Sequence, residues 1–409
     1  MDVRRSAEQA KKPMSLGGYT IAVIGAWVAF LPLLQILLPV KAAEIAPGQA
    51  MQLLGVLAAS GAAVAGVANL VVGWLSDRTK SRFGRRRPWM IAGLCGVVAS
   101  YVAIWRSDSS AGAIAAIAAF QISFNMVFSP LLALMSDYVP EARRGWASAL
   151  IGLGKPVGTA VGTIAVGAIF VGEGARFLVL AGFVLLTIAP FALRLREDRL
   201  ELHPEIAQSV SKGSVRSRLS INFVLAWLSR ICVLMTFTVV QLYLLYYLEA
   251  MSPGLSAPGL GKALTLLAIM FGVVSAATGL AAGKLSDMTR RRKPFVVGSA
   301  IAIGASMTVM GEASSWPAAT AGYALFAAGA GVHGAVEFAM IVDILPSRDH
   351  AARDLGMLNI SNILPQILAP LAVGWIEAFP GSSISWAFGA SAVAAVVALL
   401  LVGIMRGVR

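Results

Sequence analysis

The stretch that decides the fold reads Gly73-Trp-Leu-Ser-Asp77-Arg-Thr, and a short spacer joins it to Arg85-Arg-Arg-Pro88. A second copy reads Gly283-Lys-Leu-Ser-Asp287-Met-Thr and leads to Arg290-Arg-Arg-Lys-Pro294. Each copy separates one apolar run from the next. Because the two copies occur in the same order and between corresponding runs, the sequence predicts two similar halves.

Two further features support this division into halves. Asp137-Tyr-Val-Pro140 ends one apolar run, and Asp343-Ile-Leu-Pro346 ends the corresponding run of the second half. The longest polar stretch, 195–219, lies between the halves and contains charged residues, Ser and Pro. We therefore predict a bundle over 17–194, a linker over 195–219 and a second bundle over 220–405, with terminal tails at 1–16 and 406–409.

The composition excludes an ordinary soluble domain. Apolar residues make up 58% of the 409 residues and charged residues only 13%, whereas a soluble domain carries about 25% charged residues. Mean hydropathy is +0.78. The net charge of +13 comes from basic residues between apolar runs, without an accompanying aromatic patch, so we expect no nucleic-acid partner. Cys95 and Cys232 both fall inside apolar runs and read as small buried hydrophobes.

Twelve apolar runs are long enough to cross a bilayer, which takes roughly 20 helical residues. In lipid a helix satisfies its own backbone hydrogen bonds, so the predicted fold class is an all-α membrane protein. It has twelve helices in two six-helix bundles, related by a pseudo-two-fold axis normal to the membrane. The predicted spans are 17–40, 50–76, 88–106, 111–136, 146–170, 176–194, 220–248, 261–285, 294–312, 317–345, 355–378 and 384–405.

Basic residues predict the orientation. With both termini in the cytoplasm, 27 of the 33 Lys and Arg residues fall on the cytoplasmic side. The other side holds Lys41, Arg106, Arg176 and Lys262. This asymmetry indicates a multi-pass protein of the inner membrane.

Acidic residues among the basic loop residues predict a gate. Carboxylate–guanidinium pairs are directional, so pairs that form between helix ends in one state and break in another bias an equilibrium between the two. The alternative for the arginines is orientation and contact with anionic lipid. The gate residues we expect are Gly73, Asp77, Arg78, Gly84, Arg85, Asp137, Arg144, Asp287, Arg290 and Asp343.

These loop motifs resemble the signature of the major facilitator superfamily. The run from Ser76 to Pro88 is most similar to the sucrose/proton symporters and to the glycoside–pentoside–hexuronide cation symporters. The resemblance implies transport of a glycoside with a coupling cation. The sodium-coupled members carry aspartates in the second helix, but 50–76 has none and offers Asn69 instead, so a sodium site of that kind is not expected.

Charged residues at membrane depth are costly and are functional candidates. Glu337 is the acidic residue we place firmly within a span, and His333 lies four residues earlier on the same helical face. We predict that these two couple transport to protons; the alternative is that His333 bonds a neighbouring helix and Glu337 pairs statically with a base. Arg230 and Lys155 are also in spans, and either could neutralise Glu337 or hold an anionic substrate.

Neutral polar residues within spans could bind the hydroxyls of a substrate or form interhelical hydrogen bonds. These candidates are Gln35, Gln121, Asn125, Gln241, Asn359 and Asn362. Tyr243, Tyr246 and Tyr247 read as interfacial aromatics, with a sugar-stacking platform as the alternative.

The sequence thus predicts a monomeric, proton-coupled secondary transporter of a small organic solute, with a sugar or glycoside favoured. Membrane lipid is its other expected partner. Two alternatives are a non-transporting protein of the same fold that handles pigment or lipid, and an exporter of amphipathic compounds. No metal-ligand cluster, nucleophile motif or phosphate-binding loop occurs in the sequence, so we expect no enzyme activity, cofactor or metal.

Overall fold

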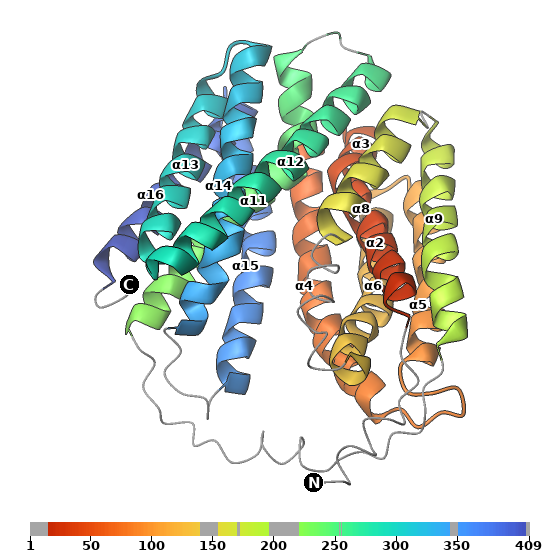
Figure 1. Cartoon of the computed structure of the whole chain (residues 1–409). Coiled ribbons are helices and arrows are strands. Elements are labelled where there is room, and N and C mark those ends of the chain that lie inside the picture. The colour runs from red at the N-terminus through yellow and green to blue at the C-terminus, as the bar shows by residue number, and fades with distance from the viewer. Residues whose placement is uncertain are drawn as a thin grey trace, which may run out of the picture. The chain divides into compact units, whose positions relative to one another are not determined.

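The computed structural model describes residues 15–139, 154–169, 172–195, 221–252, 254, 256–343 and 351–405. Within these ranges the chain forms twelve helical spans and no strand (Figure 1). The first span is α2 (Leu16–Pro32), a π-helical turn (Leu33–Leu37) and α3 (Leu38–Ile45), and the fifth is α8 (Gly154–Thr163) with a π-helical extension (Ile164–Ile169). The other spans are α4 (Ala50–Arg78), α5 (Arg87–Trp105), α6 (Ser110–Tyr138), α9 (Glu173–Arg194), α11 (Ile221–Met251), α12 (Ala257–Thr289), α13 (Lys293–Glu312), α14 (Trp316–Asp343), α15 (Ala351–Glu377) and α16 (Ile384–Ile404).

The prediction of an all-α membrane protein with twelve helices is confirmed. In the described ranges, nine of the twelve spans are long and apolar enough to cross a bilayer by length and composition. The other three are the fifth span, α14 and α15. The part of the predicted fifth span at 146–153 lies outside the described residues.

Local sequence explains where several helices start and bend. Ser15, Ser109 and Ser256 cap α2, α6 and α12, each accepting a hydrogen bond from a backbone N–H three residues on. A side-chain oxygen at this position satisfies one of the unpaired donors of a helix start. Pro32 ends α2 and a π-helical turn follows it. Prolines and π-helical turns are both recognised causes of a bend in a long helix.

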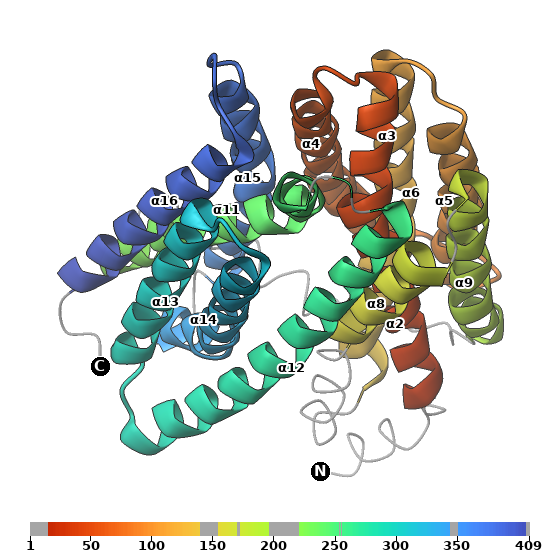
Figure 2. The ribbon, with the colours of Figure 1, turned by 90° about the horizontal axis from the view of Figure 1, so that it is seen from above.

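The chain forms two compact units. The first contains the described parts of Met1–Leu33 and Ala63–Leu200. In it, α2 packs against α8 and α9, and α5 packs against α6 and α9 (Figure 2). Aromatic side chains fill the contact between α2 and α6, as the stacked rings of Phe30 and Phe124 show, with centroids 5.0 Å apart.

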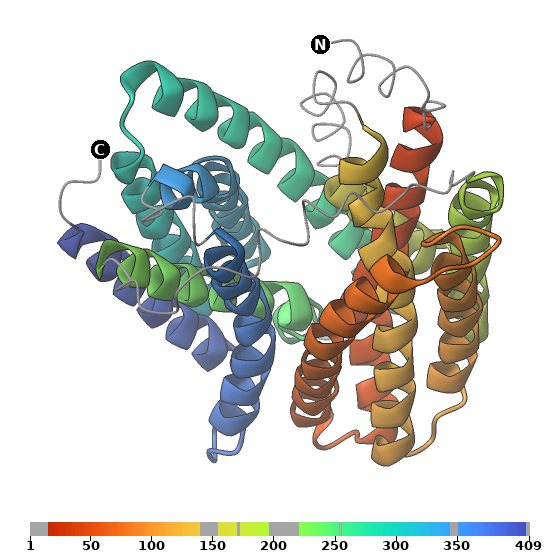
Figure 3. The ribbon, with the colours of Figure 1, turned by 90° about the horizontal axis from the view of Figure 1, so that it is seen from below.

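The second unit contains the described parts of Leu34–Ala62 and Glu201–Arg409. Here α14 packs against α12 and α13, and α16 packs against α11 and α13 (Figure 3). The end of the first span and the start of the second, Leu34–Ala62, belong to this unit, and a tyrosine of α11 contacts the end of the first span. Tyr246 donates a hydrogen bond to Pro39 O at 2.8 Å. The half-bundle boundaries taken from the repeat, 17–194 and 220–405, differ from the limits of these compact units and stay a prediction.

The three tyrosines of α11 are buried. Tyr243 donates to Pro370 O at 3.4 Å, and Tyr247 donates to Met310 O at 2.8 Å. Each hydroxyl therefore has a backbone acceptor, as a buried hydroxyl requires. These rings pack inside the unit instead of forming an open platform for a sugar.

Candidate functional site

Arg230 on α11 and Glu337 on α14 form a buried ion pair in the second unit. Their side chains are 15% and 6% exposed. Arg230 Nη2 also donates to Asn362 Oδ1 on α15 at 3.0 Å. One guanidinium thus joins three helices, and a change in the charge of Glu337 acts on the contacts of all three.

The pair is incompletely satisfied. Within the described structure, Glu337 Oε1 and Arg230 Nε are buried without a hydrogen-bond partner. Buried polar atoms are usually hydrogen-bonded, so Glu337 Oε1 is a place where a proton or a donor of a water or ligand can bind, and Arg230 Nε–H is a place where an acceptor can bind. Of the two bases that the sequence offered to neutralise Glu337, Arg230 does so.

His333 lies one turn before Glu337 on α14 and is 3% exposed. Its Nδ1 is 3.3 Å from Ser299 Oγ on α13, and its ring packs beside Phe237 at a centroid distance of 6.4 Å. Its Nε2 is buried without a partner among the described residues. His333 therefore contacts a neighbouring helix, and no hydrogen bond between described residues joins it to Glu337. Its part in proton coupling stays a prediction.

Lys155 lies in the first unit, on α8. Its side chain is exposed, and its Nζ is 5.8 Å from the centroid of the Trp27 ring on α2. That distance is within the range of a cation–π contact. Trp27 could not be singled out from the sequence, because an apolar run contains many aromatic residues.

Amide side chains gather between α4 and α6. Asn69 Nδ2 donates to Asn125 Oδ1 at 3.1 Å and to Ser129 Oγ at 2.8 Å. Gln121 is one turn before Asn125 on α6, and its Oε1 is buried without a partner in the described structure. The spacing of Gln121 and Asn125 predicted that they share one helical face. It did not predict that Asn69 belongs to the same cluster.

The remaining amide candidates are less closely gathered. Gln35 lies in the π-helical turn of the first span, and Gln241 lies on α11; both are half-buried. Asn362 is exposed on α15 and contacts Arg230. The backbone of Asn359 is in α15, but its side chain lies outside the described residues.

The predicted gate forms an ion network in the first unit. Arg86 binds Asp137 through Nε at 2.6 Å and Asp77 through Nη2 at 3.2 Å. Arg85 Nη2 binds the same oxygen of Asp137 at 2.9 Å. The buried Arg86 therefore joins the end of α4, the start of α5 and the end of α6. The sequence named the arginine cluster without showing that Arg86 is its centre.

The surroundings shape this network. Gly84 has φ of +100°, a conformation that favours glycine, and turns the chain between α4 and α5. Arg78 stacks over Trp74, with its guanidinium 4.0 Å from the ring centroid. Gly73 has open space where a Cβ would be, so no close approach explains this glycine.

The second copy of the motif differs in the described structure. Asp287 is exposed near the end of α12, and Arg290 is exposed in the left-handed conformation that ends this helix. The side chain of Asp343 and the whole of Arg144 lie outside the described residues. The ion network is thus seen for the first copy of the motif.

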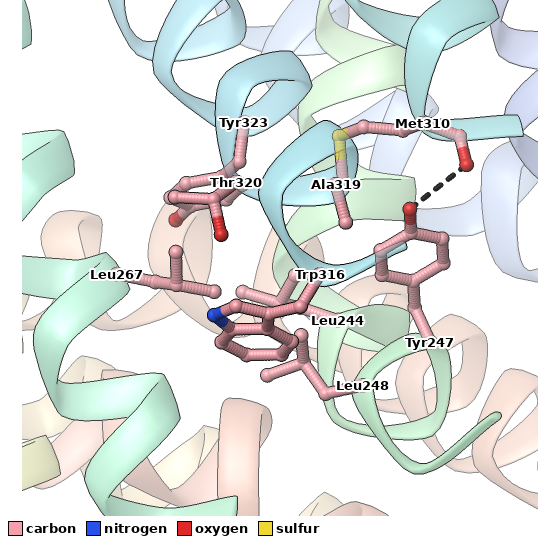
Figure 4. Close-up of a pocket in the computed structure, with 9 residues that line it drawn as sticks. All are labelled: Leu244, Tyr247, Leu248, Leu267, Met310, Trp316, Ala319, Thr320 and Tyr323. Atoms are coloured by element: carbon pink, nitrogen blue, oxygen red, sulfur yellow. Dashed lines mark hydrogen bonds between the residues drawn. The ribbon is translucent and has the colours of Figure 1, made fainter. Parts of the chain in front are cut away.

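A small pocket in the second unit contains none of the charged or amide residues predicted for the site, although Tyr247 lines it. It lies among α11, α12, α13 and α14, and Trp316 faces it beside leucine side chains (Figure 4). Its lining is mainly apolar: Leu244, Tyr247, Leu248, Leu267, Met310, Trp316, Ala319, Thr320 and Tyr323. The hydroxyl of Tyr247 is already engaged by Met310 O, so the pocket offers few polar groups to a ligand.

The family described as Major Facilitator Superfamily matches residues 15–331 and 254–409. A comparison with curated protein sequences finds no match.

Two solved structures have similar folds. One is a bacterial homolog to the human lysosomal transporter Spinster, in an inward-facing and occupied conformation. It is 14% identical, with a TM-score of 0.73 and coverage of 95% of each chain. The other is a D-xylose–proton symporter, 17% identical, with a TM-score of 0.68 and coverage of 96% of this chain and 97% of that one. At these identities the likeness concerns the fold.

Proposed function

The chain belongs to the Major Facilitator Superfamily, and from this premise we propose that it is a proton-coupled secondary transporter of a small organic solute. It works by alternating access, in which the substrate site opens to one side of the membrane at a time. The observation that carries the proposal is the buried pair of Arg230 and Glu337, with its orphan carboxylate oxygen.

The pair supplies the differential stabilisation that coupling needs. A deprotonated Glu337 attracts Arg230, and protonation removes that charge. Because Arg230 also holds Asn362 on α15, loading a proton changes the contacts among α11, α14 and α15. A ligand shifts a two-state equilibrium only by as much as it binds the two states differently, and this pair gives the proton such a difference.

The amide cluster supports a substrate that carries hydroxyl groups, with a glycoside favoured. An amide oxygen accepts hydrogen bonds, and Gln121 Oε1 is a buried acceptor without a partner in the described structure. The resemblance of the run from Ser76 to Pro88 to glycoside symporters points the same way.

The network around Arg86 is proposed as the cytoplasmic gate. Asp137 forms ion pairs with two arginines and Asp77 with one. The end of α4, the start of α5 and the end of α6 are therefore joined while the network is intact. Breaking it frees these ends to move. This assignment depends on the orientation predicted from the basic loops. In that orientation the protein spans the inner membrane and both termini lie in the cytoplasm.

Uptake of a labelled panel of glycosides and other organic solutes by whole cells tests the proposal, with and without an uncoupler. We expect at least one solute to accumulate in cells that contain the protein and accumulation to stop with the uncoupler. Accumulation that is insensitive to the uncoupler contradicts proton coupling. No uptake of any solute, with the protein present in the membrane, favours the non-transporting alternative.

A further inference from the structure

Lys155, the second residue of α8, is a cation without a counter-ion among the described residues of its unit. The acidic residues of this unit with described side chains are Asp77, Asp108 and Asp137, and all three lie at helix ends or in a loop. Asp77 and Asp137 are engaged by arginines of the gate network. In the second unit, by contrast, Arg230 is neutralised by Glu337.

Close packing of α8 on α2 determines where the Lys155 ammonium lies. A Cβ at Gly154 would come within 2.8 Å of Val23 Cγ1, and one at Gly158 within 2.6 Å of Trp27 Cβ. These glycines let the two helices approach closely. Lys155, next to Gly154, is thereby held beside Trp27, which lies well inside the first span.

An aromatic row continues from Trp27 along α6. The Trp27 ring meets Phe128 edge-on at a centroid distance of 5.3 Å, and Phe128 stacks on Phe124 at 5.2 Å. Trp27 and Phe128 are half-buried, so part of each ring is free to contact another molecule. Aromatic surfaces of this kind bind apolar or ring-shaped groups.

A polar row lies next to the aromatic row on the same helix. Phe124 and Phe128 alternate with Asn125 and Ser129 at helical spacing, and Gln121 begins the polar row. Gln121 is 4% exposed and its Oε1 has no partner in the described part of the chain. The first unit therefore presents a cation, an aromatic surface and an orphan acceptor on neighbouring helices.

We propose that the transported solute is an organic anion with a ring, whose carboxylate pairs with Lys155 and whose ring packs against Trp27 and Phe128. This inference deepens the proposed function and rests on it. A charge at membrane depth without a counter-ion is costly. A carboxylate that arrives with the substrate removes that cost while it is bound, and a neutral solute of the same shape does not.

Binding to the purified full-length protein tests the charge of the ligand with matched probes. Phenyl β-D-glucuronide is compared with phenyl β-D-glucoside, and benzoate with benzyl alcohol. We expect the anionic member of at least one pair to bind about tenfold tighter or more than its neutral partner. Lys155→Gln abolishes that difference without weakening the neutral member, whereas Lys155→Arg retains it.

Lys262→Gln is the matched control, because Lys262 is an exposed lysine at the start of α12 in the second unit. It leaves both affinities unchanged. Equal or tighter binding of the neutral members, absence of binding by both pairs, or an anion preference that survives Lys155→Gln overturns the inference. Lys155→Arg controls for misfolding because it keeps the positive charge. If this variant folds but loses the anion preference, that result also contradicts the inference.

Transport measured in proteoliposomes with the same probes separates this inference from the proposed function. Lys155-dependent binding of an anion that is never accumulated sustains the site and refutes the transporter. Proton-driven accumulation of neutral solutes only, unaffected by Lys155→Gln, sustains the transporter and refutes the anion site.

Discussion

Arg230 and Glu337 lie 107 residues apart in the sequence and form a buried ion pair between α11 and α14. Neither residue has a second charged partner in the described structure, although Asn362 adds a hydrogen bond to Arg230. The charge of each residue is therefore offset mainly by the other. Stability and coupling should depend on the pair in different ways, which makes the two roles separable.

Removing one partner should destabilise the protein more than removing both. Glu337→Ala leaves a buried guanidinium without its counter-ion, which typically costs about 3–5 kcal/mol. The double variant Arg230→Leu/Glu337→Leu should recover most of that loss, because an apolar pair of similar volume needs no compensation. Thermal unfolding of the purified proteins in detergent measures both. A double variant as unstable as Glu337→Ala contradicts this account, and the recovered double variant should still be inactive in uphill transport.

The two carboxylates of the gate network should differ in importance. The side chain of Asp137 is 18% exposed and binds two arginines, whereas that of Asp77 is 58% exposed and binds one. Exposed ion pairs contribute about 0–1 kcal/mol, so Asp77→Asn should slow transport in a folded protein with little change in stability. Asp137→Asn should slow transport further and lower the unfolding temperature.

Asp108→Asn is the control for this comparison, since Asp108 is exposed in the loop before α6. Uptake kinetics and thermal unfolding are measured for all three variants. Normal uptake by both Asp77→Asn and Asp137→Asn removes the gate assignment. A larger effect of Asp77→Asn reverses the proposed order of the two carboxylates.

The close contact of α12 with α14 should depend on Gly331. A Cβ at this position would lie 2.2 Å from Ser275 O and 2.4 Å from Thr278 Oγ1. Gly331→Ala therefore forces the helices apart, and overpacking of this kind costs about 1–3 kcal/mol. Gly334→Ala is the matched control, because nothing lies within 4 Å of a Cβ there. Equal unfolding temperatures for the two variants contradict the close packing.

The twelve helices were predictable because a bilayer imposes length and apolarity on every span, and these show in the sequence. Charged residues such as Glu337 and Arg230 stand out for the same reason, as exceptions within apolar runs. Their pairing was not predictable, since Lys155 was an equal candidate and helix rotation decides which base meets the carboxylate. Arg86 was hidden among neighbouring arginines, and Trp27 among aromatic residues, because their roles come from packing partners distant in sequence.

The orientation given by the basic loops can be tested by thiol labelling of intact cells. In a background with Cys95 and Cys232 replaced by Ala, single cysteines are introduced at Gly48, Lys262, Arg82 and Lys212. An impermeant thiol reagent added outside should label the cysteines at Gly48 and Lys262, because few basic residues lie on that side. It should not label those at Arg82 and Lys212 until the cells are opened. The reverse pattern overturns the orientation and the placement of the gate.

Accumulation of a transported solute in proteoliposomes, driven by an imposed pH gradient, tests the central claim most directly. Glu337→Gln removes the titratable group but keeps a similar shape and polarity, and Glu312→Gln makes the same change at an exposed position at the end of α13. We predict that Glu337→Gln abolishes uphill accumulation while retaining binding or exchange of the solute, and that Glu312→Gln behaves like the wild type. Accumulation by Glu337→Gln in response to the pH gradient would contradict the account and leave Glu337 with a structural role.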